Sequence, residues 1–565
     1  MLPSVMGRNV LRRALGTATP SGPATGDRWS ELLGGSSRWQ AARSEAVGPR
    51  VLIATNLGGF QQGTVLESLL AVSLTLRGAQ VEFLMCEADL PACQLTKVVK
   101  ISPRRVARVG TRPLCDSCVA SGRDAYSPLG LKIHRLGDQL EVSDRRTLHD
   151  RALAADLGDD ADLDALTTAG VGVREHAWAG ALRYYGRGDL AGERYGGAIL
   201  RHYLEAAMVT ALSTRRLLER ENYDVAVFHH GIYVPQGIVG EVCRDMGVRV
   251  VNSNPAYRQQ TWVFSHGDTY HKTMIEEPNR RWLERSFTPA QDLELDAYLA
   301  SRRSGAGDWI HFNKEPVEAS SAVLRDTGLD PNKPIIGLLS NVVWDAQLHY
   351  GDNAFPGMVP WVLHTIRWFA TRPDLQLIIR VHPAEVTGLV PSRQPLVDEI
   401  RRALPELPPN VAVIPPESKV STYAAMDLCD TVLIYNTKTG IELAAVGIPV
   451  LVVGEAWIRG KGFSTDVTSV ESYDEALASL PRGSRMSPAE VELARRYAYH
   501  FFFRRMIPLP LIASPAQFQF HLEVDELSQL EAGVTSGLDT ICDGILSGAP
   551  FEISSDDRRG EDLAS

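Results

Sequence analysis

The stretch Asp430–Gly454 has the sequence DTVLIYNTKTGIELAAVGIPVLVVG, in which two apolar runs flank a short helical segment. Runs such as TVLIY and PVLVV are typical of strands that are buried on both faces of a parallel sheet. The turn after the first run is small, polar and rich in hydroxyl groups, and a single carboxylate, Glu442, follows it. The stretch therefore predicts a βαβ unit whose polar turn is a candidate ligand site.

The same alternation of strand and helix extends on both sides of this stretch. Five apolar runs alternate with helical segments across residues 330–486, which predicts a Rossmann-like domain. Another alternation begins at Arg50 with RVLIATNLGG, a helix and VEFLMC, and continues with YDVAVFHH and VRVVNSN, within residues 47–310. We therefore expect an α/β protein with two Rossmann-like, doubly wound domains.

The segments outside these two alternations have weaker patterns. Residues 1–46 contain TATPSGPATGD and are expected to form a flexible N-terminal extension. Within the first domain, Glu141–Asp189 lacks a strand pattern and is expected to form a helical insertion. Residues 487–565 begin with a capping box at Ser487 and Glu490, so helices and a frayed tail are expected there.

The composition is that of an ordinary globular protein, with 44% apolar and 22% charged residues among 565. The formal net charge is -10 with acids and bases interspersed, which argues against general nucleic-acid binding. No apolar run reaches the roughly 18 residues of a membrane span, so we expect a soluble protein, at most peripheral at the inner membrane. The 7 cysteines are too few for a disulfide scaffold and favour the reducing cytoplasm.

Polar residues gather where the strands of the second domain end. The carboxyl ends of parallel strands share one edge of a sheet, and in doubly wound domains that edge binds ligands. The residues are Ser340 and Asn341, with Asp345 and His349 in the next loop; Arg380, His382 and Glu385; Ser418 and Ser421; and Asn436, Thr437, Thr439 and Gly440.

Each of these residues also has an ordinary structural explanation. Serine and threonine at helix starts cap free N–H groups, and Glu442 in a first helical turn complements the helix dipole. Taken together, however, Arg380, His382 and the hydroxyl groups form a set of donors suited to phosphate. A carboxylate has two acceptor oxygens at the spacing of a diol, so Glu442 is a candidate partner for a ribose. The set predicts a site for a nucleotide mono- or diphosphate between the domains.

Two stretches of the second domain, RVHPAE and NTKTGIELAAVGIPVLVVG, resemble the GT-B glycosyltransferases, and most closely the bacterial capsule polysaccharide biosynthesis proteins. The resemblance is specific over Pro334–Asp466 and looser in the first domain, where it rests on the segment from Tyr223 and on FSHGDTYH. It implies two domains that face each other across a cleft. The second would hold a nucleotide-sugar donor, and the first would receive a surface-polysaccharide or other glycan acceptor.

The resemblance also implies roles for single residues and leaves some questions open. Arg380 and His382 would face the donor phosphates, Ser418 and Ser421 would lie near them or the base, Thr437 and Thr439 would contact phosphate, and Glu442 would hold the ribose. No catalytic metal is implied. Val450 stands where many retaining enzymes have a second glutamate, so the stereochemical outcome stays open. A nucleotide-sugar epimerase, a CDP-alcohol phosphotransferase and a non-catalytic nucleotide-binding scaffold of the same fold are the alternatives.

The first domain offers candidates for the acceptor side of such a cleft. The loop NLGGFQQGT either lets a ligand approach closely at Gly58, Gly59 and Gln61 or forms a plain tight turn. The strand VAVFHH ends at His229 and His230, which are candidate general bases. His266 and Asp268 in FSHGDTYH are candidates of the same kind and equally plausible as structural residues. We take His229, His230 and Asp268 as the candidate catalytic residues.

Four cysteines lie near one another in the sequence: Cys86, Cys93, Cys115 and Cys118. The last two form a C-x2-C knuckle, which with two further thiols meets the ligand count of a closed structural zinc site. The C-x6-C spacing of the first two is unusual for zinc, so buried free thiols are an equal alternative and an iron–sulfur cluster a less favoured one. A zinc ion here would shape the acceptor side of the cleft and take no part in catalysis.

Overall fold

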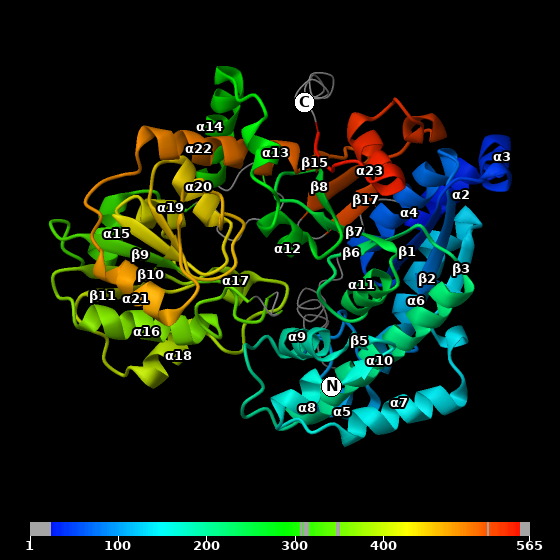
Figure 1. The fold of residues 1–565 in the computed structure, drawn as a ribbon, viewed down its shortest axis with the longest axis horizontal. Helices are drawn as coiled ribbons and strands as arrows, with labels where there is room; N and C mark the ends of the chain where they lie inside the picture. Colours follow the sequence, from blue (N-terminus) through cyan, green and yellow to red (C-terminus); the bar gives the residue numbers. More distant parts are fainter. Residues whose placement is uncertain are drawn as a thin grey trace, which may run out of the picture.

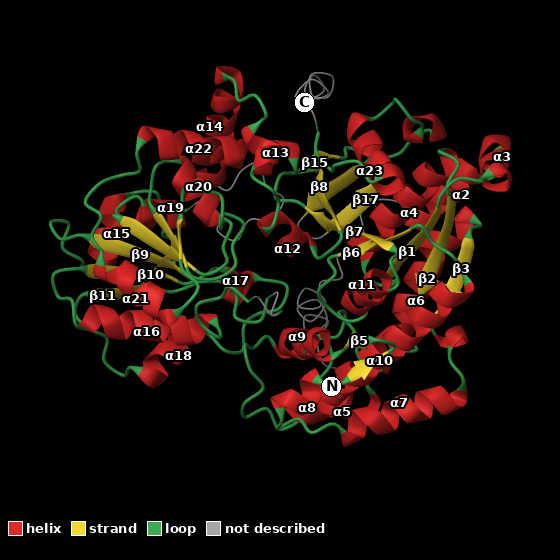
Figure 2. Cartoon of the chain, in the orientation of Figure 1, coloured by secondary structure: helices red, strands yellow, loops and turns green. Residues whose placement is uncertain are grey.

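The computed structural model describes residues 24–304, 308, 316–345, 348, 351–516 and 519–553. Two lobes stand side by side, and each is built on a central sheet covered by helices on both faces (Figures 1 and 2). This arrangement confirms the expected α/β fold with two Rossmann-like, doubly wound domains.

The first sheet has seven strands and is parallel over most of its width. β1 pairs in parallel with β2 and β6, β2 with β3, and β6 with β7, whereas β8 and β15 are added antiparallel at one edge. In spatial order the strands are β15 (Ile507–Pro508), β8 (Thr261–His266), β7 (Arg249–Pro255), β6 (Val225–His229), β1 (Arg50–Asn56), β2 (Gln80–Met85) and β3 (Lys132–Arg135).

Helices cover both faces of the first sheet because its strands are buried on both sides. One face packs on the segment that links β3 to β6, and the other on α4 and the two ends of the chain. The helices are α2 (Thr25–Leu33), α3 (Ser37–Glu45), α4 (Gln61–Leu76), α5 (Pro103–Val109), α6 (Arg112–Tyr126), α7 (Val142–Ala154), α8 (Asp160–Asp164), α9 (Arg174–Tyr185), α10 (Gly196–Arg220), α11 (Gln236–Asp245) and α23 (Ser536–Ser547). A short hairpin, β4 (Thr167–Thr168) with β5 (Val171–Gly172), interrupts the helical insertion.

The second sheet has six strands, all parallel. Its spatial order is β11 (Val411–Ile414), β10 (Gln376–Arg380), β9 (Ile335–Leu339), β12 (Thr431–Ile434), β13 (Val450–Val452) and β14 (Thr465–Asp466). The order reverses direction at β9 and β12, and such a switch point opens a ligand crevice at the carboxyl ends of the strands. The domain's own helices are α15 (Ser320–Thr327), α16 (Met358–Ala370), α17 (Ala384–Thr387), α18 (Leu396–Ala403), α19 (Thr422–Met426), α20 (Thr439–Ala445) and α21 (Val470–Ala478).

The chain crosses between the lobes at two levels. α12 (Tyr270–Ile275), α13 (Arg280–Leu283) and α14 (Pro289–Ser304) bury Met274, Trp282 and Leu295 in the core of the second lobe. α22 (Pro488–Tyr499) lies on α20, and the π-helical turn His500–Arg504 then leads back to the first sheet through β15. The boundaries expected at residues 310 and 487 therefore do not coincide with the packing of the side chains.

Two expectations about the ends of the chain need correction. Residues 24–46 hold α2 and α3, whose Trp29 and Trp39 are buried in the core of the first lobe, so this part of the expected flexible extension is ordered by apolar packing. The C-terminal region contains strands as well as helices: β15 and the hairpin of β16 (Ile512–Ala516) with β17 (Gln519–Leu522). The tail expected at residues 554–565 and the N-terminal residues 1–23 lie outside the described residues.

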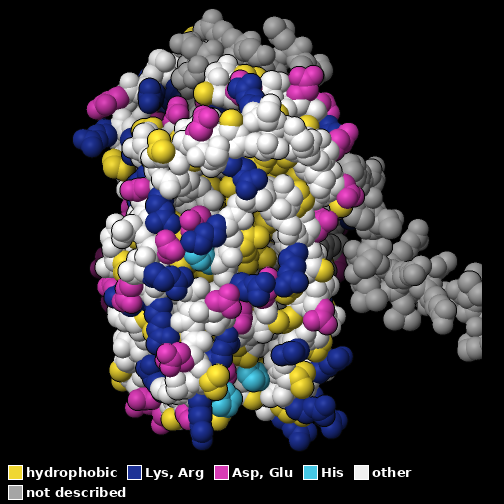
Figure 3. All heavy atoms as spheres, turned by 90° about the vertical axis from the view of Figure 1, so that its right-hand side faces the viewer, with side chains coloured by type: hydrophobic (Ala, Val, Ile, Leu, Met, Phe, Trp, Pro, Cys, Tyr) yellow, Lys and Arg dark blue, Asp and Glu magenta, His cyan; other side chains and the backbone are white. Residues whose placement is uncertain are grey.

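The surface of the first lobe shows mixed charge. Lysine, arginine, aspartate and glutamate are interspersed over the face in Figure 3, with small hydrophobic areas between them. Among the described residues, the structure contains no helix of the length and apolarity needed to cross a membrane.

Candidate functional site

A cavity of about 520 Å³ lies between the two lobes and takes side chains from both. The second domain contributes the ends of β9, β10 and β12 and the loops that follow them. The first domain contributes the end of β6, the loop after β1 and residues of the helical insertion. The polar strand ends predicted from the sequence therefore meet the two histidines of the other domain in one cleft.

Seven of the predicted donor residues line this cavity. The carbonyl oxygens of the Asn341 and Asn436 side chains are buried and have no hydrogen-bond partner among the described residues. Two unpartnered acceptors in one cavity are a signature of a polar ligand, because a buried amide oxygen otherwise forfeits its hydrogen bond. The seven are Asn341, Arg380, His382, Ser421, Asn436, Thr437 and Thr439. His349, which the sequence placed nearby, lies outside the described residues.

Arg380 uses most of its guanidinium to hold the protein together. Its Nη1 donates to the carbonyls of Val381 and Pro415 at 2.9 and 2.7 Å, and its Nη2 donates to that of Ser418 at 3.2 Å. Burial lowers the pKa of Arg380 to about 10, which still leaves the side chain charged at neutral pH. Arg380 thus fixes the ends of two strands and adds a positive charge to the cavity wall, while its buried Nε has no partner among the described residues.

His382 is a neutral side chain held in a defined tautomer. The backbone N–H of Ala384 donates to its Nδ1 at 3.0 Å, and its own backbone N–H donates to Ser340 Oγ at 3.0 Å. Nδ1 is therefore the unprotonated nitrogen, and the proton resides on Nε2. Burial, with repulsion from Arg380 and Lys438, lowers the pKa of His382 to about 4. At neutral pH this imidazole can donate a hydrogen bond to a ligand oxygen without carrying charge.

Glu442 does not line the cavity, although it is buried and only 2% exposed. Lys438 Nζ lies 2.6 Å from its Oε1 and Arg302 Nε lies 3.0 Å from the same oxygen, while the Tyr423 hydroxyl donates to Oε2. Burial would raise the pKa of Glu442, but the charges of Arg302 and Lys438 and these hydrogen bonds lower it to about 2. Its three partners all line the cavity, so in this structure Glu442 lies behind the cavity wall and positions residues that form it.

Three further residues of the predicted donor set lie outside the cavity wall. Glu385 accepts from the N–H of Leu396 at the start of α18, and burial raises its pKa to about 7. The Ser418 hydroxyl accepts from Val420 N–H, so its side chain shapes the turn. Gly440 packs on Ile434, where an added Cβ would lie 2.5 Å from Ile434 Cδ1. These positions have the local structural roles that strand-end residues commonly have.

The first-domain wall contains both predicted histidines. β6 ends at His229, and His230 then adopts a left-handed conformation with φ of 66°, which turns the chain at the cavity. His229 contacts Phe60 at a ring distance of 4.5 Å, and His230 stacks on Tyr233 at 5.4 Å. Burial lowers the pKa of His229 to about 3 and that of His230 well below 6.5, with repulsion from Arg183 acting on both. Both imidazoles are therefore neutral at pH 7, the form that can accept a proton.

Asp268 and the glycine loop do not face the cavity. Asp268 Oδ1 accepts from the N–H of Thr269 at 2.6 Å, and Asp268 Oδ2 lies 3.4 Å from Lys272 Nζ, so this carboxylate stabilises the start of α12. An added Cβ at Gly58 would lie 2.4 Å from the Cys118 carbonyl, which shows that the loop packs tightly on α6. Gly58, Gly59 and Gln61 therefore serve packing, and it is their neighbours Phe60 and Gln62 that line the cavity.

Several cavity residues were not predicted as site residues from the sequence. On the first-domain side they are Lys97, Arg183, Tyr233 and Tyr270; on the other they are Tyr257, Trp344, Lys438 and the pair Arg302 and Asp308. Asp345, which the sequence placed at the strand ends, also lines the cavity. The Tyr233 hydroxyl donates to Asp345 Oδ1 at 3.1 Å, which joins the two walls. Lys438 lies within the polar turn quoted first and could have been singled out there. Lys97 and Arg183 lie in segments without a motif, and only the folded chain brings them to the site.

The four clustered cysteines lie around a cavity of about 20 Å³ beside the loop after β1. Among the described residues, the one group of three candidate metal ligands with ligand atoms within 4.8 Å of one another is Glu277, His500 and Glu552, so no three of these sulfurs are that close. All seven cysteines are free, and burial raises the pKa of Cys86, Cys93, Cys115 and Cys118. The thiols as placed do not fit a zinc site and match the buried free thiols of the alternative interpretation.

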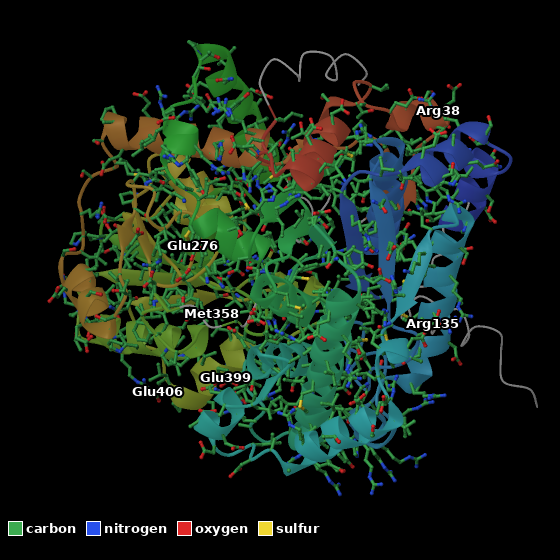
Figure 4. The ribbon with its side chains drawn as sticks, turned by 45° about the vertical axis from the view of Figure 1, so that its right-hand side comes forward. Arg38, Arg135, Glu276, Met358, Glu399 and Glu406 are labelled. Carbon is green, nitrogen blue, oxygen red and sulfur yellow. The ribbon has the colours of Figure 1, made fainter. Side chains whose placement is uncertain are left out.

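Met358 packs behind one wall of the cavity. Its Sδ lies 3.0 Å from the backbone N of Asn341, which lines the cavity. In Figure 4, Met358 lies in the interior of the second lobe, whereas Glu406 lies toward the lower edge of that lobe and Arg38 and Arg135 lie on the opposite side of the molecule.

Two Rossmann-like domains with a polar cleft between them are the arrangement that the resemblance to GT-B glycosyltransferases implies. Residues 316–487 match the family model "Capsule polysaccharide biosynthesis protein", which confirms the resemblance drawn from the sequence over that part of the chain. No match was found among curated protein sequences.

Solved structures also match the chain, at low similarity. The KpsC beta Kdo 2,4 transferase of Thermosulfurimonas dismutans has a TM-score of 0.33 and 14% identity, over 55% of this chain and 88% of the other. The UDP-GlcNAc 2-epimerase of Neisseria meningitidis has a TM-score of 0.24 and 11% identity, over 80% and 95%. The glycosyltransferase SsfS6 of Streptomyces sp. SF2575, complexed with thymidine diphosphate, has a TM-score of 0.23 and 14% identity, over 80% and 94%.

Proposed function

We propose that this protein is a glycosyltransferase that moves a sugar from a nucleotide-sugar donor to a capsule-like surface polysaccharide or another glycan acceptor. The observation that carries the proposal is the single cleft in which the strand ends of one Rossmann-like domain face His229 and His230 of the other. The match of residues 316–487 to capsule polysaccharide biosynthesis proteins supports this class of substrate. We expect the protein to act in the cytoplasm, where nucleotide sugars are made, with the acceptor presented at the inner membrane.

The second-domain wall is suited to the donor. His382 offers an uncharged N–H, Ser421, Thr437 and Thr439 offer hydroxyl donors, and Arg380 adds positive charge. Such donors stabilise the negative charge that develops on the leaving phosphate when the bond between sugar and phosphate breaks. Lys438, held by Glu442, adds a cation on the same wall. No bound metal is needed in this proposal, because these groups supply the positive potential.

The first-domain wall is suited to activating the acceptor. In the transfer, a hydroxyl oxygen of the acceptor forms the new bond to the sugar, its proton passes to a base, and the nucleotide leaves. Nδ1 of His230 is buried and has no partner among the described residues, so its position in the cavity wall is what makes it the candidate acceptor of that proton. Burial lowers the pKa of His230, so the protonated ring needs the negative charge of the departing phosphate nearby. We propose His230 as the base and His229 as the residue that fixes its ring position by packing, at a centroid distance of 5.2 Å.

Binding of the donor nucleotide can be tested directly. We expect calorimetry with CMP, UDP and GDP in turn to show binding of one of them, and His382→Ala to weaken it by about tenfold, the value of a hydrogen bond to a charged group. His364→Ala is the matched control, because His364 Nε2 pairs with Asp474 at 2.7 Å and does not line the cavity. Absence of nucleotide binding, or equal affinity in His382→Ala and the wild type, would contradict the donor site.

The reaction class can be tested separately with a panel of nucleotide sugars. A glycosyltransferase releases nucleotide in proportion to acceptor, whereas an epimerase of the same fold converts its substrate without one. His230→Asn retains a side chain that tolerates the left-handed backbone and should reduce kcat by at least about 100-fold with little change in donor affinity. Turnover at the wild-type rate in this variant would eliminate His230 as the base.

A further inference from the structure

Lys97 and Arg183 form a pair of cations on the first-domain wall of the cavity. Lys97 lies between β2 and α5, and Arg183 lies near the end of α9, so the helical insertion brings them to one place. The two side chains repel each other, and that repulsion adds to burial in lowering the pKa of Lys97 to about 7. The guanidinium of Arg183 lies over the ring of Tyr233, on which His230 stacks, so Arg183 lies near the proposed base.

The pair differs from Lys438, Arg302 and Arg303 because no carboxylate neutralises it, and from Arg380, whose guanidinium is held by three backbone carbonyls. Lys438 and Arg302 share Glu442, and Arg303 pairs with Asp427 at 2.6 Å and Glu318 at 3.1 Å. Across the residues that the structure describes, no ion pair joins Lys97 or Arg183 to an aspartate or glutamate. Buried charges are normally paired, so an unpaired cationic pair in a cavity indicates that a ligand supplies the anion.

Arg183 is held in place without a carboxylate partner. Its Nη1 donates to the carbonyl of Gln94 at 2.6 Å, and its guanidinium lies 5.0 Å from the ring centre of Tyr233 and 5.9 Å from that of Trp344. Aromatic and carbonyl contacts fix a guanidinium while leaving most of its N–H donors for another partner. The side chain is thus preorganised for an anion, as is typical of carboxylate and phosphate recognition.

We infer that Lys97 and Arg183 bind a negatively charged group, a carboxylate or a phosphate, on the glycan acceptor. The inference rests on the proposed function, because it assigns the first-domain wall to the acceptor. It makes the acceptor an acidic sugar or a phosphorylated glycan, and places its charge close to His229 and His230. A neutral glycan of the same size would leave the two cations without a partner.

The test uses three probes that share a sugar ring and differ in charge. Glucuronate carries a carboxylate, glucose 6-phosphate carries a phosphate and glucose carries neither. We expect ligand-observed NMR titrations of the full chain without nucleotide to show one or both charged probes binding at least about tenfold more tightly than glucose. The stronger of the two charged probes identifies the anion. Charged probes that bind no more tightly than glucose would overturn the inference.

Variants link this preference to the pair. Lys97→Gln should remove most of the preference for the charged probe, and Arg183→Gln should do the same if the variant folds. Lys333→Gln is the matched control, because Lys333 is an exposed lysine that does not line the cavity and does not contribute to the pKa shift of Lys97. Lys97 is only partly buried, so Lys97→Gln should fold. This variant therefore decides the test even if Arg183→Gln does not fold.

The same variants separate this inference from the proposed function. Nucleotide binding and sugar transfer test the glycosyltransferase, whereas the probes are measured without nucleotide. Lys97→Gln should leave nucleotide affinity within about twofold of wild type. A loss of nucleotide affinity as large as the loss of probe affinity would assign the pair to the donor and overturn the acceptor subsite, even with the glycosyltransferase established.

Discussion

Glu442 acts on the cavity through other residues. Its buried carboxylate contacts Lys438, Arg302 and Tyr423, and all three of these residues line the cavity. Lys438 also lies 4.4 Å from the ring centre of Tyr257, so the ammonium group is fixed from two directions. Removing the carboxylate would leave two buried cations facing each other, which is more costly than losing one hydrogen bond.

Glu442→Gln should therefore lower both stability and nucleotide affinity. We expect a loss of about 3 kcal/mol in the free energy of unfolding, because a buried ion pair is broken on one side. The pKa of Glu442 is about 2 in the folded chain against an ordinary 4.5, so its contribution is fully present above pH 4.5 and is lost as the pH falls toward 2.

The measurement is the thermal midpoint of Glu442→Gln and wild type at several pH values. The difference should be largest near neutral pH and should narrow as the pH falls from about 4.5 toward 2. Glu475→Gln serves as the control, because Glu475 is exposed on α21. A difference that does not change with pH would show that the carboxylate charge is not what matters.

Without a bound anion, the charge on Lys97 should lower the free energy of unfolding. Its pKa is about 7 in the folded chain against an ordinary 10.5, so the unfolded chain binds more protons between these values and stability rises with pH through that window. Below pH 7 Lys97 is charged in the folded and in the unfolded chain, so its destabilising effect on the folded protein is fully present there. Lys97→Met should raise stability by roughly 1–3 kcal/mol near pH 6, allowing for its half-buried side chain, and by less near pH 9.

Thermal midpoints of Lys97→Met, Lys333→Met and wild type at the two pH values check this. The exposed Lys333, which does not contribute to the pKa shift of Lys97, should show no comparable gain. An equal or lower midpoint for Lys97→Met would mean that the lysine already has a stabilising partner in the protein. If Lys97→Met gains stability and loses probe binding, then Lys97 contributes to ligand binding at a cost in stability.

Some residues of the site can be predicted from the sequence, and others cannot. Asn341, His382, Asn436 and Thr437 follow strands directly, so the strand pattern alone places them at the cleft. Glu442 was predicted to contact ribose because its position in the helix was known and its partners were not. Arg302 comes from another helix, α14, far from Glu442 in the sequence. No pattern near Glu442 therefore predicts the contact between the two side chains.

At the scale of elements, the returning C-terminal segment is held by close backbone contacts. α23 packs on β15 through Gly537, where an added Cβ would lie 1.8 Å from the Pro508 carbonyl oxygen. The π-helical turn before β15 carries the buried His500, whose Nε2 lies 2.9 Å from Glu277. Glu277 also pairs with Arg505 at 3.2 Å, so the crossing between the lobes is fixed by charge as well as by packing.

Gly537→Ala should destabilise the first lobe, because α23 must move away from β15 to admit the methyl group. We expect a loss of about 1–3 kcal/mol, the usual cost of overpacking a core. The thermal midpoint measures the loss, with Gly172→Ala as the control, since an added Cβ at Gly172 would meet nothing within 4 Å. Equal midpoints for the two variants would show that α23 is loosely held.

The elements themselves were predictable to different degrees. Strands such as β1, β6, β9 and β12 are continuous apolar runs between turns, and the sequence predicts them. β15 has two residues, too few to form a pattern, and it exists because β8 presents an open edge beside it. α2 and α3 were missed because their apolar residues are few, and Trp29 and Trp39 do most of the burying.

For the whole molecule, the core of the first lobe depends on segments from both ends of the chain. Trp29 and Trp39 share one cluster with Ile541 and Phe551, across the same face of the sheet. Two Rossmann-like folds were predictable because their patterns are local, whereas this joint core is a long-range contact that no local pattern encodes.

Removing residues 506–565 should therefore unfold the first lobe and leave the second largely intact. Hydrogen exchange should become fast in β7 and β8 and stay slow in β9 and β10, which provide the internal control in the same sample. Slow exchange in β7 and β8 of the shortened chain would mean that the first lobe has a self-sufficient core.

The place of β15 in the first sheet has a consequence for synthesis. A ribosome makes β8 about 240 residues before it makes the strand that covers that edge. The nascent first lobe must therefore wait, with an open edge and an uncovered apolar face, while the entire second domain is translated. We expect cellular chaperones to be most needed in this interval, and fusing a partner that shields β8 to improve the yield of folded protein.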